Sequence, residues 1–301
     1  LADEHVSDAE LLADPVEKVR AVDGRRHSSI PLPADLFGAR RNSDGIDLQD
    51  SAILGDTAQA IAATPLAPLA PAPIGNEVSR ALDGFAQWSQ HPIEARATAL
   101  ERLADLLEEN RIALMATLVH EARKTLPDAL GEVREAVDFC RYYAQQARDG
   151  LAPVELPGPT GERNVLRFAG RGVWVCIAPW NFPLAIFLGQ IAAALVTGNS
   201  VVAKPAPQTP RIAAQAISLA HEAGIPADAL ILATGGPDVG AALIADCRIA
   251  GAAFTGSTAT AKRIARALLE DDDRPLVPLI AETGGINAMI VDSTALPEQA
   301  V

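Results

Sequence analysis

The sequence predicts an α/β protein with a doubly wound parallel sheet, preceded by a helical region and an extended linker. Two features of the chain from Gly172 onward support this fold class. Short, fully apolar runs, typical of strands buried on both faces, alternate with longer helical stretches. Because such alternation favours parallel strands joined by right-handed crossover helices, we expect ligands outside the carboxyl ends of the strands.

The clearest unit of this pattern is Gly172–Pro205. Val173–Ile177 is β-branched and aromatic and is bounded by glycine and proline, so it is predicted as a strand. The stretch Pro183–Val196, rich in Ala, Leu and Ile, predicts a helix with proline in its first turn and Gly198 as its C-cap. Asn199–Lys204 is the next predicted strand.

The alternation of strand and helix continues downstream of this unit. Helices are predicted at Arg211–Glu222, Asp238–Ala245 and Thr258–Leu269, and strands at Leu230–Thr234, Ile249–Phe254, Leu276–Ala281 and Ala288–Val291. Most consecutive strands are therefore separated by a helix, as a parallel sheet requires.

Upstream of the sheet, residues 76–149 have the pattern of amphipathic helices, with apolar residues at helical spacing along Val78–Trp88. The charged residues of Gly131–Asp149 lie mainly three or four apart and predict exposed ion pairs. Glu108 and Glu109 are likewise expected on a solvated face.

Four regions are expected along the chain. Residues 1–73 alternate short helical pieces with Pro-, Ala- and charge-rich stretches and are predicted as a linker region, with Ala67–Gly75 extended. Residues 74–150 are predicted as N-terminal helices. Residues 151–170, broken by prolines and glycines, are predicted as a hairpin, and residues 171–301 as an incomplete sheet domain.

The composition limits the classes of function. With 49% hydrophobic and 21% charged residues the chain has the balance of a soluble globular protein, and its formal net charge of −13 argues against a nucleic-acid partner. Cys140, Cys176 and Cys247 are odd in number and far apart, as in reduced thiols of an intracellular protein. The five histidines are dispersed, so no metal site is predicted. The apolar helix at Pro183–Val196 falls short of the roughly 20 residues of a membrane span and is predicted to lie in the core.

Two loops after predicted strands are candidate binding sites, Ala178–Asn181 and Lys204–Gln208. No G-x-G-x-x-G follows a strand, so the usual dinucleotide fingerprint is absent. Gly256 and Ser257, however, follow a buried strand and open a helix, where unpaired N–H groups and the helix dipole can hold a pyrophosphate. A capping role for Ser257 or Thr258 is the equal alternative.

Several residues after strands have both a chemical and a structural interpretation. The amide of Asn181 can donate to a developing oxyanion or cap the following helix. Glu282, predicted at the end of a buried strand, is either half of a structural ion pair or a tuned acid or base. A lysine at a strand end, such as Lys204, is ordinarily solvated. Gly235 and Gly236 either form a turn or allow a ligand to approach the backbone closely.

Four motifs carry a resemblance to a known family. APWNFP, GNSVVAKP, FTGS and ETGG occur in this order at Ala178–Pro183, Gly198–Pro205, Phe254–Ser257 and Glu282–Gly285. Their order resembles that of the aldehyde dehydrogenase superfamily over roughly Pro71 to Val301.

Longer stretches are closer still to one branch of that superfamily. GSTATA from Gly256 and IAETGGINAMIVDSTALPEQ at Ile280–Gln299 are similar to the glutamate-semialdehyde (pyrroline-5-carboxylate) dehydrogenase half of bifunctional proline-catabolic flavoenzymes. Ser29–Leu48 resembles the segment that joins this half to a proline dehydrogenase domain in those proteins.

The resemblance implies roles for the motif residues. Asn181 would donate to the oxyanion, and Glu282 would activate water for thioester hydrolysis. NAD would be held by Ile177, Ala178, Pro179 and Trp180 at the nicotinamide, by Lys204 at the adenosine ribose, by Gly236 near the adenine, by Thr255, Gly256 and Ser257 at the pyrophosphate, and further by Gly240, Thr283 and Gly284. The nucleophilic cysteine of the family is expected beyond Val301, and none of the three cysteines present is expected to replace it.

Three positions depart from the family pattern. Pro207 stands where an acidic residue usually meets the ribose, which leaves the choice between NAD and NADP open. Ala261 replaces a frequent glycine, and Ile286 replaces a residue that is usually polar.

The function implied by the resemblance is NAD-dependent oxidation of glutamate semialdehyde to glutamate in proline catabolism. A fragment without the nucleophile is expected to bind nucleotide weakly and to turn over no aldehyde. The alternatives are an aldehyde dehydrogenase of other substrate range and a catalytically dead assembly module. The implied partners are a small aldehyde, a proline dehydrogenase domain of the same polypeptide that would carry FAD, and further copies of the chain, which the hairpin would contact. The implied location is the bacterial cytoplasm, with peripheral inner-membrane contact through the upstream domain as a further option.

Overall fold

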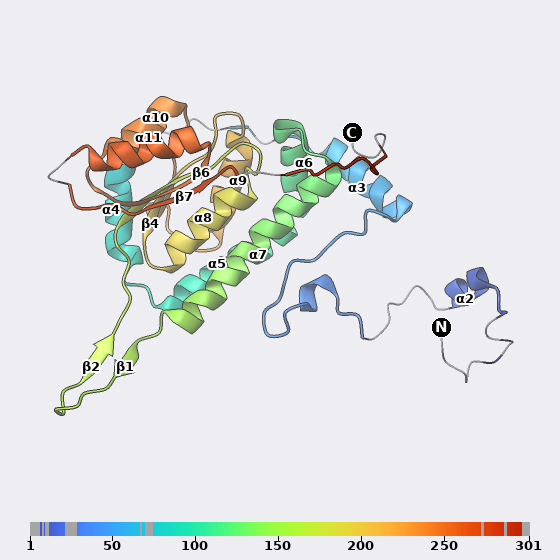
Figure 1. The fold of residues 1–301 in the computed structure, drawn as a ribbon, viewed down its shortest axis with the longest axis horizontal. Coiled ribbons are helices and arrows are strands. Elements are labelled where there is room, and N and C mark those ends of the chain that lie inside the picture. Colours follow the sequence, from blue (N-terminus) through green and yellow to red (C-terminus); the bar gives the residue numbers. More distant parts are fainter. Residues whose placement is uncertain are drawn as a thin grey trace.

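A parallel sheet with helices on both faces forms the centre of the computed structural model (Figure 1). The structure describes residues 7, 9, 12–21, 29–66, 68–69, 75–271, 274–285 and 288–296. Within these residues the sheet has the strand order β5-β4-β3-β6-β7. The strands are β3 (Val173–Ile177), β4 (Ser200–Lys204), β5 (Leu230–Leu232), β6 (Ile249–Gly256) and β7 (Leu279–Thr283). The predicted fold class is therefore confirmed.

The strand register brings the carboxyl ends of the strands to one edge. Ile177 of β3 pairs with Lys204 of β4 on one side and with Phe254 of β6 on the other. Thr255 of β6 pairs in turn with Glu282 of β7. The chain leaves β3 toward β4 and β5 and later returns on the opposite side of β3, so the order reverses between β3 and β6. Ligands of such sheets bind at this switch point.

Alternate residues of the strands face two separate cores. Val173 and Val175 pack with α4 (Glu77–Trp88), α10 (Pro237–Ala245) and α11 (Thr258–Leu269) on one face. Cys176 packs on the other face with α5 (Ile93–Glu109), α7 (Leu126–Gly150), α8 (Ala185–Val196) and α9 (Pro210–Glu222). Burial on both faces explains why these strands are apolar throughout.

The helix predicted from Pro183 to Val196 is α8, which lies between the sheet and α7 and is buried along most of its length. It begins later than predicted, because Leu184 is its N-cap and Pro183 precedes it. Gly198 follows the C-cap Thr197 with φ of 89°, a left-handed conformation that glycine adopts without strain. No helix in the described part of the chain is both long and apolar enough to cross a membrane.

The prediction that the charged residues of α7 form exposed pairs was wrong for two of them. Glu132 and Arg141 are 2% and 5% exposed. The Glu132 carboxylate accepts hydrogen bonds from the N–H groups of Leu184 (3.2 Å) and Ala185 (2.9 Å), so it caps α8. Because α7 packs against both α5 and α8, its charged residues on those sides are enclosed and need partners from other elements.

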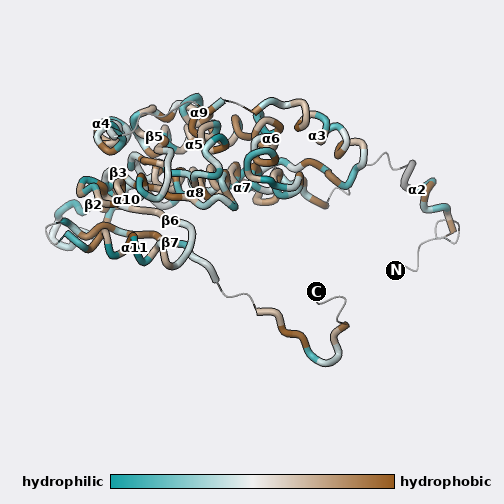
Figure 2. Tube along the Cα trace, turned by 90° about the horizontal axis from the view of Figure 1, so that it is seen from above, coloured by the Kyte–Doolittle hydropathy of each residue, from teal (hydrophilic) through white to brown (hydrophobic). Residues whose placement is uncertain are grey.

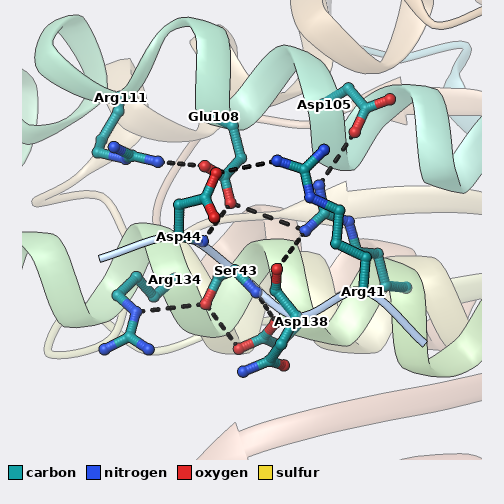
Figure 3. Close-up of polar contacts among 10 residues, drawn as sticks. Arg41, Ser43, Asp44, Asp105, Glu108, Arg111, Arg134 and Asp138 are labelled. Atoms are coloured by element: carbon teal, nitrogen blue, oxygen red, sulfur yellow. Dashed lines mark hydrogen bonds and ion pairs between the residues drawn. The ribbon is translucent and has the colours of Figure 1, made fainter. Parts of the chain in front are cut away.

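A polar network fixes the segment around Ser43 against α5 and α7 (Figure 3). Asp138 of α7 accepts hydrogen bonds from the backbone N–H (2.7 Å) and the hydroxyl (2.8 Å) of Ser43. Glu108 of α5 accepts from the N–H of Asp44 at 2.8 Å and pairs with Arg111. Glu108, predicted on a solvated face, is therefore largely enclosed by this segment, whereas Glu109 is exposed.

The rest of the region before α4 contains α2 (Pro15–Ala21), a 3₁₀ turn at Pro33–Asp35 and α3 (Ser51–Ala63). Asp50 caps α3 by accepting from the N–H groups two and three residues on. Much of the predicted extended linker, at residues 67 and 70–74, lies outside the described residues.

The helix α6 (Arg111–Ala122) packs against α7 and α9. After α7 the predicted hairpin forms from β1 (Val154–Leu156) and β2 (Asn164–Leu166). The two strands pair antiparallel, and the hairpin projects from the body of the molecule (Figure 1). Its role as an oligomer contact stays a prediction.

The strand predicted at Ala288–Val291 was wrong. These residues have no regular structure, and Met289 and Ile290 are 77% and 93% exposed. Figure 2 shows an apolar stretch beyond β7 that lies clear of the sheet. A strand needs a neighbour to pair with, and local apolarity alone does not supply one. Ile286, which departs from the family pattern, and residues 297–299 of the last motif lie outside the described residues.

Candidate functional site

A cavity of about 1780 Å³ lies at the carboxyl edge of the sheet. Its walls come from the ends of β3, β4, β6 and β7 and from α8, α10 and α11. All of the predicted site residues except Gly236 line it: Ile177, Ala178, Pro179, Trp180, Asn181, Lys204, Gly240, Thr255, Gly256, Ser257, Glu282, Thr283 and Gly284. Residues from four strand ends therefore meet in one place, as the parallel register requires.

The loop after β3 forms one wall of the cavity. Ala178 is buried, and its N–H donates to the carbonyl of Lys204 at 3.1 Å, so this loop and the end of β4 are held together. Trp180 is 57% exposed, and Asn181 is exposed beside it. Asn181 does not cap α8, because Glu132 does, and its amide makes no hydrogen bond within the described part of the chain. The amide is therefore available to a ligand.

Lys204 ends β4 inside the cavity and is 5% exposed, so it is not a solvated strand end. Its Nζ donates to the carbonyl of Pro205 at 3.3 Å. Burial lowers the pKa of Lys204, and the negative charge of Asp238 acts in the opposite direction. The pKa shift has this sign because removing water disfavours the ammonium form while a nearby carboxylate favours it.

The turn after β5 lies beside this lysine. Gly235 has φ of 144°, and Gly236 is the N-cap of α10. Gly236 does not line the cavity itself, but the next two residues, Pro237 and Asp238, do. A Cβ on Gly240 would lie 3.3 Å from Cδ and Cε of Lys204, so the absence of a side chain there makes room for the lysine stem.

The turn between β6 and α11 contains the predicted pyrophosphate residues. Ser257 is the N-cap of α11, and its hydroxyl accepts from the N–H of Thr260 at 3.2 Å. The capping interpretation is thus correct for Ser257, and it is compatible with ligand binding because the other N–H groups of the first turn still face the helix N-terminus. Ala261 is 8% exposed and packs in the core beneath the turn.

Glu282 lies on a more open strand than predicted. β7 is the edge of the sheet within the described residues, and Glu282, Thr283 and Gly284 are exposed. The prediction of a buried strand end was wrong because only one side of β7 is paired. The carboxylate nevertheless lines the same cavity as Asn181.

None of the three cysteines lines the cavity. Burial raises the pKa of both Cys140 and Cys176 to about 12, which keeps them as neutral thiols near neutral pH. Cys247 is exposed and follows the end of α10. Since the thiolate is the nucleophilic form, the two buried cysteines are poor nucleophiles.

Gln190 and Asp238 are among the lining residues that the sequence predictions missed. Gln190 of α8 donates from Nε2 to Oγ1 of Thr255 at 2.9 Å, which ties α8 to the end of β6. Asp238 stands in the first turn of α10. The sequence could have indicated a site role for both residues. Gln190 is a polar residue within an apolar helix, and Asp238 is a carboxylate just after a buried strand.

Comparisons with known proteins point to one family. The model of the family described as "Aldehyde dehydrogenase family" matches residues 57–301. The bifunctional protein PutA of Rhizobium meliloti is 44% identical over 99% of this chain and 26% of its own length. The 1-pyrroline-5-carboxylate dehydrogenase of Geobacillus thermodenitrificans is 40% identical over 71% of this chain and 42% of its own length.

Solved structures give the same result. A crystal structure of bifunctional proline utilization A superposes with a TM-score of 0.85 and 53% identity, over 99% of this chain and 31% of that one. The 1-pyrroline-5-carboxylate dehydrogenase of Thermus thermophilus superposes with a TM-score of 0.75 and 28% identity, over 86% of this chain and 56% of that one. The chain spans about a quarter of the length of the curated PutA relatives.

Proposed function

Because the chain belongs to the aldehyde dehydrogenase family, we propose that it is the nucleotide-binding part of an enzyme that oxidises L-glutamate γ-semialdehyde to L-glutamate. The observation that carries the proposal is the meeting of Asn181, Lys204 and Glu282 in one cavity at the switch point of the sheet. The substrate is taken from relatives named as PutA and 1-pyrroline-5-carboxylate dehydrogenase.

The residues around the cavity fit a dinucleotide such as NAD, which would supply the hydride acceptor. Lys204 offers a buried cation, and the N-terminus of α11 offers N–H donors for phosphate oxygens. Ile177, Pro179 and Trp180 offer an apolar surface for a planar ring. The structure thus provides donors for the charged part of the ligand and an apolar wall for the aromatic part.

Two residues would act on the aldehyde and its products. The Asn181 amide, exposed and without a partner among the described residues, would donate to the oxygen that gains negative charge when the carbonyl is attacked. Glu282 would accept a proton from the water that releases the acid. We propose that the attacking thiolate comes from a part of the protein beyond these 301 residues, since Cys140 and Cys176 are buried as neutral thiols.

The test uses the complete protein and follows NADH absorbance with glutamate semialdehyde. Asn181→Ala is expected to lower kcat about 10²- to 10³-fold, as loss of an oxyanion donor does. Glu282→Gln is expected to retain a single burst of NADH but to lose steady turnover about 10²- to 10⁴-fold, because hydride transfer precedes hydrolysis. Asp149→Asn, which changes a carboxylate at the far end of α7, is the matched control. Full steady turnover in Glu282→Gln would refute the assigned role.

Two further parts of the proposal concern the whole protein. The PutA relatives are described as bifunctional, which supports a proline dehydrogenase domain, with FAD, in the same polypeptide. Val154, Leu156 and Leu166 expose apolar surface on the β1-β2 hairpin, which supports its use as a contact between copies of the chain. Sedimentation of the complete protein with and without Leu156→Asp would test the second part.

A further inference from the structure

One lysine is linked to both ends of the segment between Asn181 and the start of α8. Lys124 follows α6, and its side chain is 14% exposed. Its Nζ lies 2.9 Å from Oε1 of Glu132 and 4.3 Å from the centre of the Phe182 ring. Phe182 is the neighbour of Asn181 in the loop after β3, and Glu132 caps α8, where that loop ends. The ammonium therefore contacts the loop directly at Phe182 and indirectly through Glu132.

The backbone at Lys124 is itself held in place. Arg123 has φ of 58°, the left-handed conformation that ends a helix, and the N–H of Lys124 donates to the carbonyl of Leu118 at 3.3 Å. The next residue, Thr125, is the N-cap of α7. Because Lys124 stands between the end of one helix and the cap of the next, its side chain extends from a fixed point.

The Asn181 amide, by contrast, has no contact of its own to fix it. Asn181 is exposed and makes no hydrogen bond within the residues that the structure describes. Its neighbour Phe182 precedes Pro183, so its backbone is restricted to extended conformations and cannot absorb much movement. The Phe182 side chain is 40% exposed and is enclosed only in part. A shift of the Phe182 ring would therefore move Asn181 as well.

The two partners of Lys124 have different effects on it. The Glu132 side chain is 1% exposed, and its carboxylate holds the ammonium because a buried charge needs a partner. The ammonium is in turn attracted to the negative face of the Phe182 ring, and this attraction is stronger where water is excluded. Phe182 lines the cavity. Lys124 thus joins the buried cap of α8 to an aromatic ring on the cavity wall.

We propose that Lys124 is a positioning residue that holds the Asn181 amide where it can donate to the oxyanion. The inference rests on the proposed function, in which Asn181 is that donor. Lys124 does not line the cavity itself, so it would act through Phe182 and the loop. A displacement of about 1 Å in a catalytic site can lower the rate about 10²-fold, so a contact that fixes this loop should affect kcat.

The test measures kcat of the complete protein from NADH absorbance with glutamate semialdehyde. Lys124→Met keeps the length of the side chain, removes the charge, and is expected to lower kcat about 10- to 100-fold. Lys124→Arg keeps a cation for the carboxylate and the ring and is expected to retain most of the activity. The control is Lys18→Met on α2, which makes the same change in net charge outside the cavity lining and is expected to leave kcat unchanged.

A double-mutant cycle with Asn181→Ala shows whether Lys124 acts through the amide. If it does, Lys124→Met lowers kcat by less than about twofold once residue 181 is alanine. Equal fold losses in the two backgrounds would overturn the proposal. A residue that only stabilised the fold would lower the urea midpoint and leave kcat of the folded enzyme unchanged, so circular dichroism at the assay temperature is used to confirm that each variant is folded.

The outcomes separate this inference from the proposed function. If Asn181→Ala is fully active, the oxyanion assignment fails and this inference fails with it. If Asn181→Ala is impaired and Lys124→Met is as active as wild type, only the role of Lys124 is refuted. A Lys124→Arg variant as impaired as Lys124→Met would show that the positive charge is not what positions the loop, which also overturns the inference.

Discussion

Replacing Glu132 with alanine is expected to destabilise the protein through the start of α8. The Glu132 carboxylate accepts from the N–H groups of Leu184 and Ala185 and pairs with Nζ of Lys124 at 2.9 Å. Leu184 and Ala185 are fully buried, so water cannot replace the carboxylate there. The substitution leaves two buried donors and one cation without an acceptor.

The size of the effect can be estimated from these contacts. Hydrogen bonds to a charged acceptor contribute about 1.5–3 kcal/mol each. Removing one partner of a buried ion pair costs about 3–5 kcal/mol. These contributions overlap, and the side chain of Lys124 is 14% exposed and can turn toward water. We therefore expect the free energy of unfolding to fall by about 3–5 kcal/mol in total.

Urea unfolding followed by circular dichroism measures this change. The midpoint should fall in Glu132→Ala with the slope unchanged. Glu132→Gln keeps an acceptor for the backbone but loses the charge that pairs with Lys124, so an intermediate loss is expected. The control is Glu135→Ala. Partial burial and the charge of Glu132 raise the pKa of Glu135, so the folded protein disfavours its ionised form. Removing this carboxylate is therefore expected not to lower the free energy of unfolding at a pH above that pKa. A loss below about 0.5 kcal/mol in Glu132→Ala, the size of a surface substitution, would refute the reasoning.

Two further predictions concern thiols and glycines. At pH 8 a thiol reagent should label Cys247 quickly, and Cys140 and Cys176 only after unfolding, because burial raises their pKa values to about 12; fast labelling of all three in the native protein would contradict this. Gly251→Ala should destabilise by about 1–3 kcal/mol, since its Cβ would lie 2.2 Å from the partly buried indole ring of Trp174. Gly131→Ala on the open face of α7 should instead stabilise by about 0.5–1 kcal/mol. Thermal melts that rank the two variants the other way would be inconsistent with the packing.

The elements of the sheet could be predicted from the sequence because their signals are local. Val173–Ile177 and Thr258–Leu269 were predicted with the bounds that the structure gives. The burial of Glu132 could not be predicted this way, since spacing along α7 is the same for a solvated face and for a face enclosed by α8. The exposure of β7 depends likewise on which strands are available to pair with it, and an apolar run such as Ala288–Val291 does not contain that information.

The candidate site was predicted mainly through motif order, whereas the missed lining residues Gln190 and Asp238 act through distant partners. Gln190 bonds to Thr255, 65 positions along the chain. Asp238, in the first turn of α10, acts on Lys204 at the end of β4. Neither relation has a fixed sequence spacing, so each becomes visible only when the strand register is known.

The absence of a G-x-G-x-x-G fingerprint is consistent with this site, because the glycines of the site have a different steric role from those of the fingerprint. A Cβ on Gly256 would lie 2.6 Å from Cζ of Phe254, and one on Gly236 would lie 2.7 Å from Oδ1 of Asp238. These glycines make room for side chains of the protein, whereas fingerprint glycines let the backbone approach a pyrophosphate. The site is instead located by the register that places Thr255 beside Glu282 and by the reversal of strand order at β3. Glycine spacing is therefore a poor guide to a site of this kind, and strand topology is a good one.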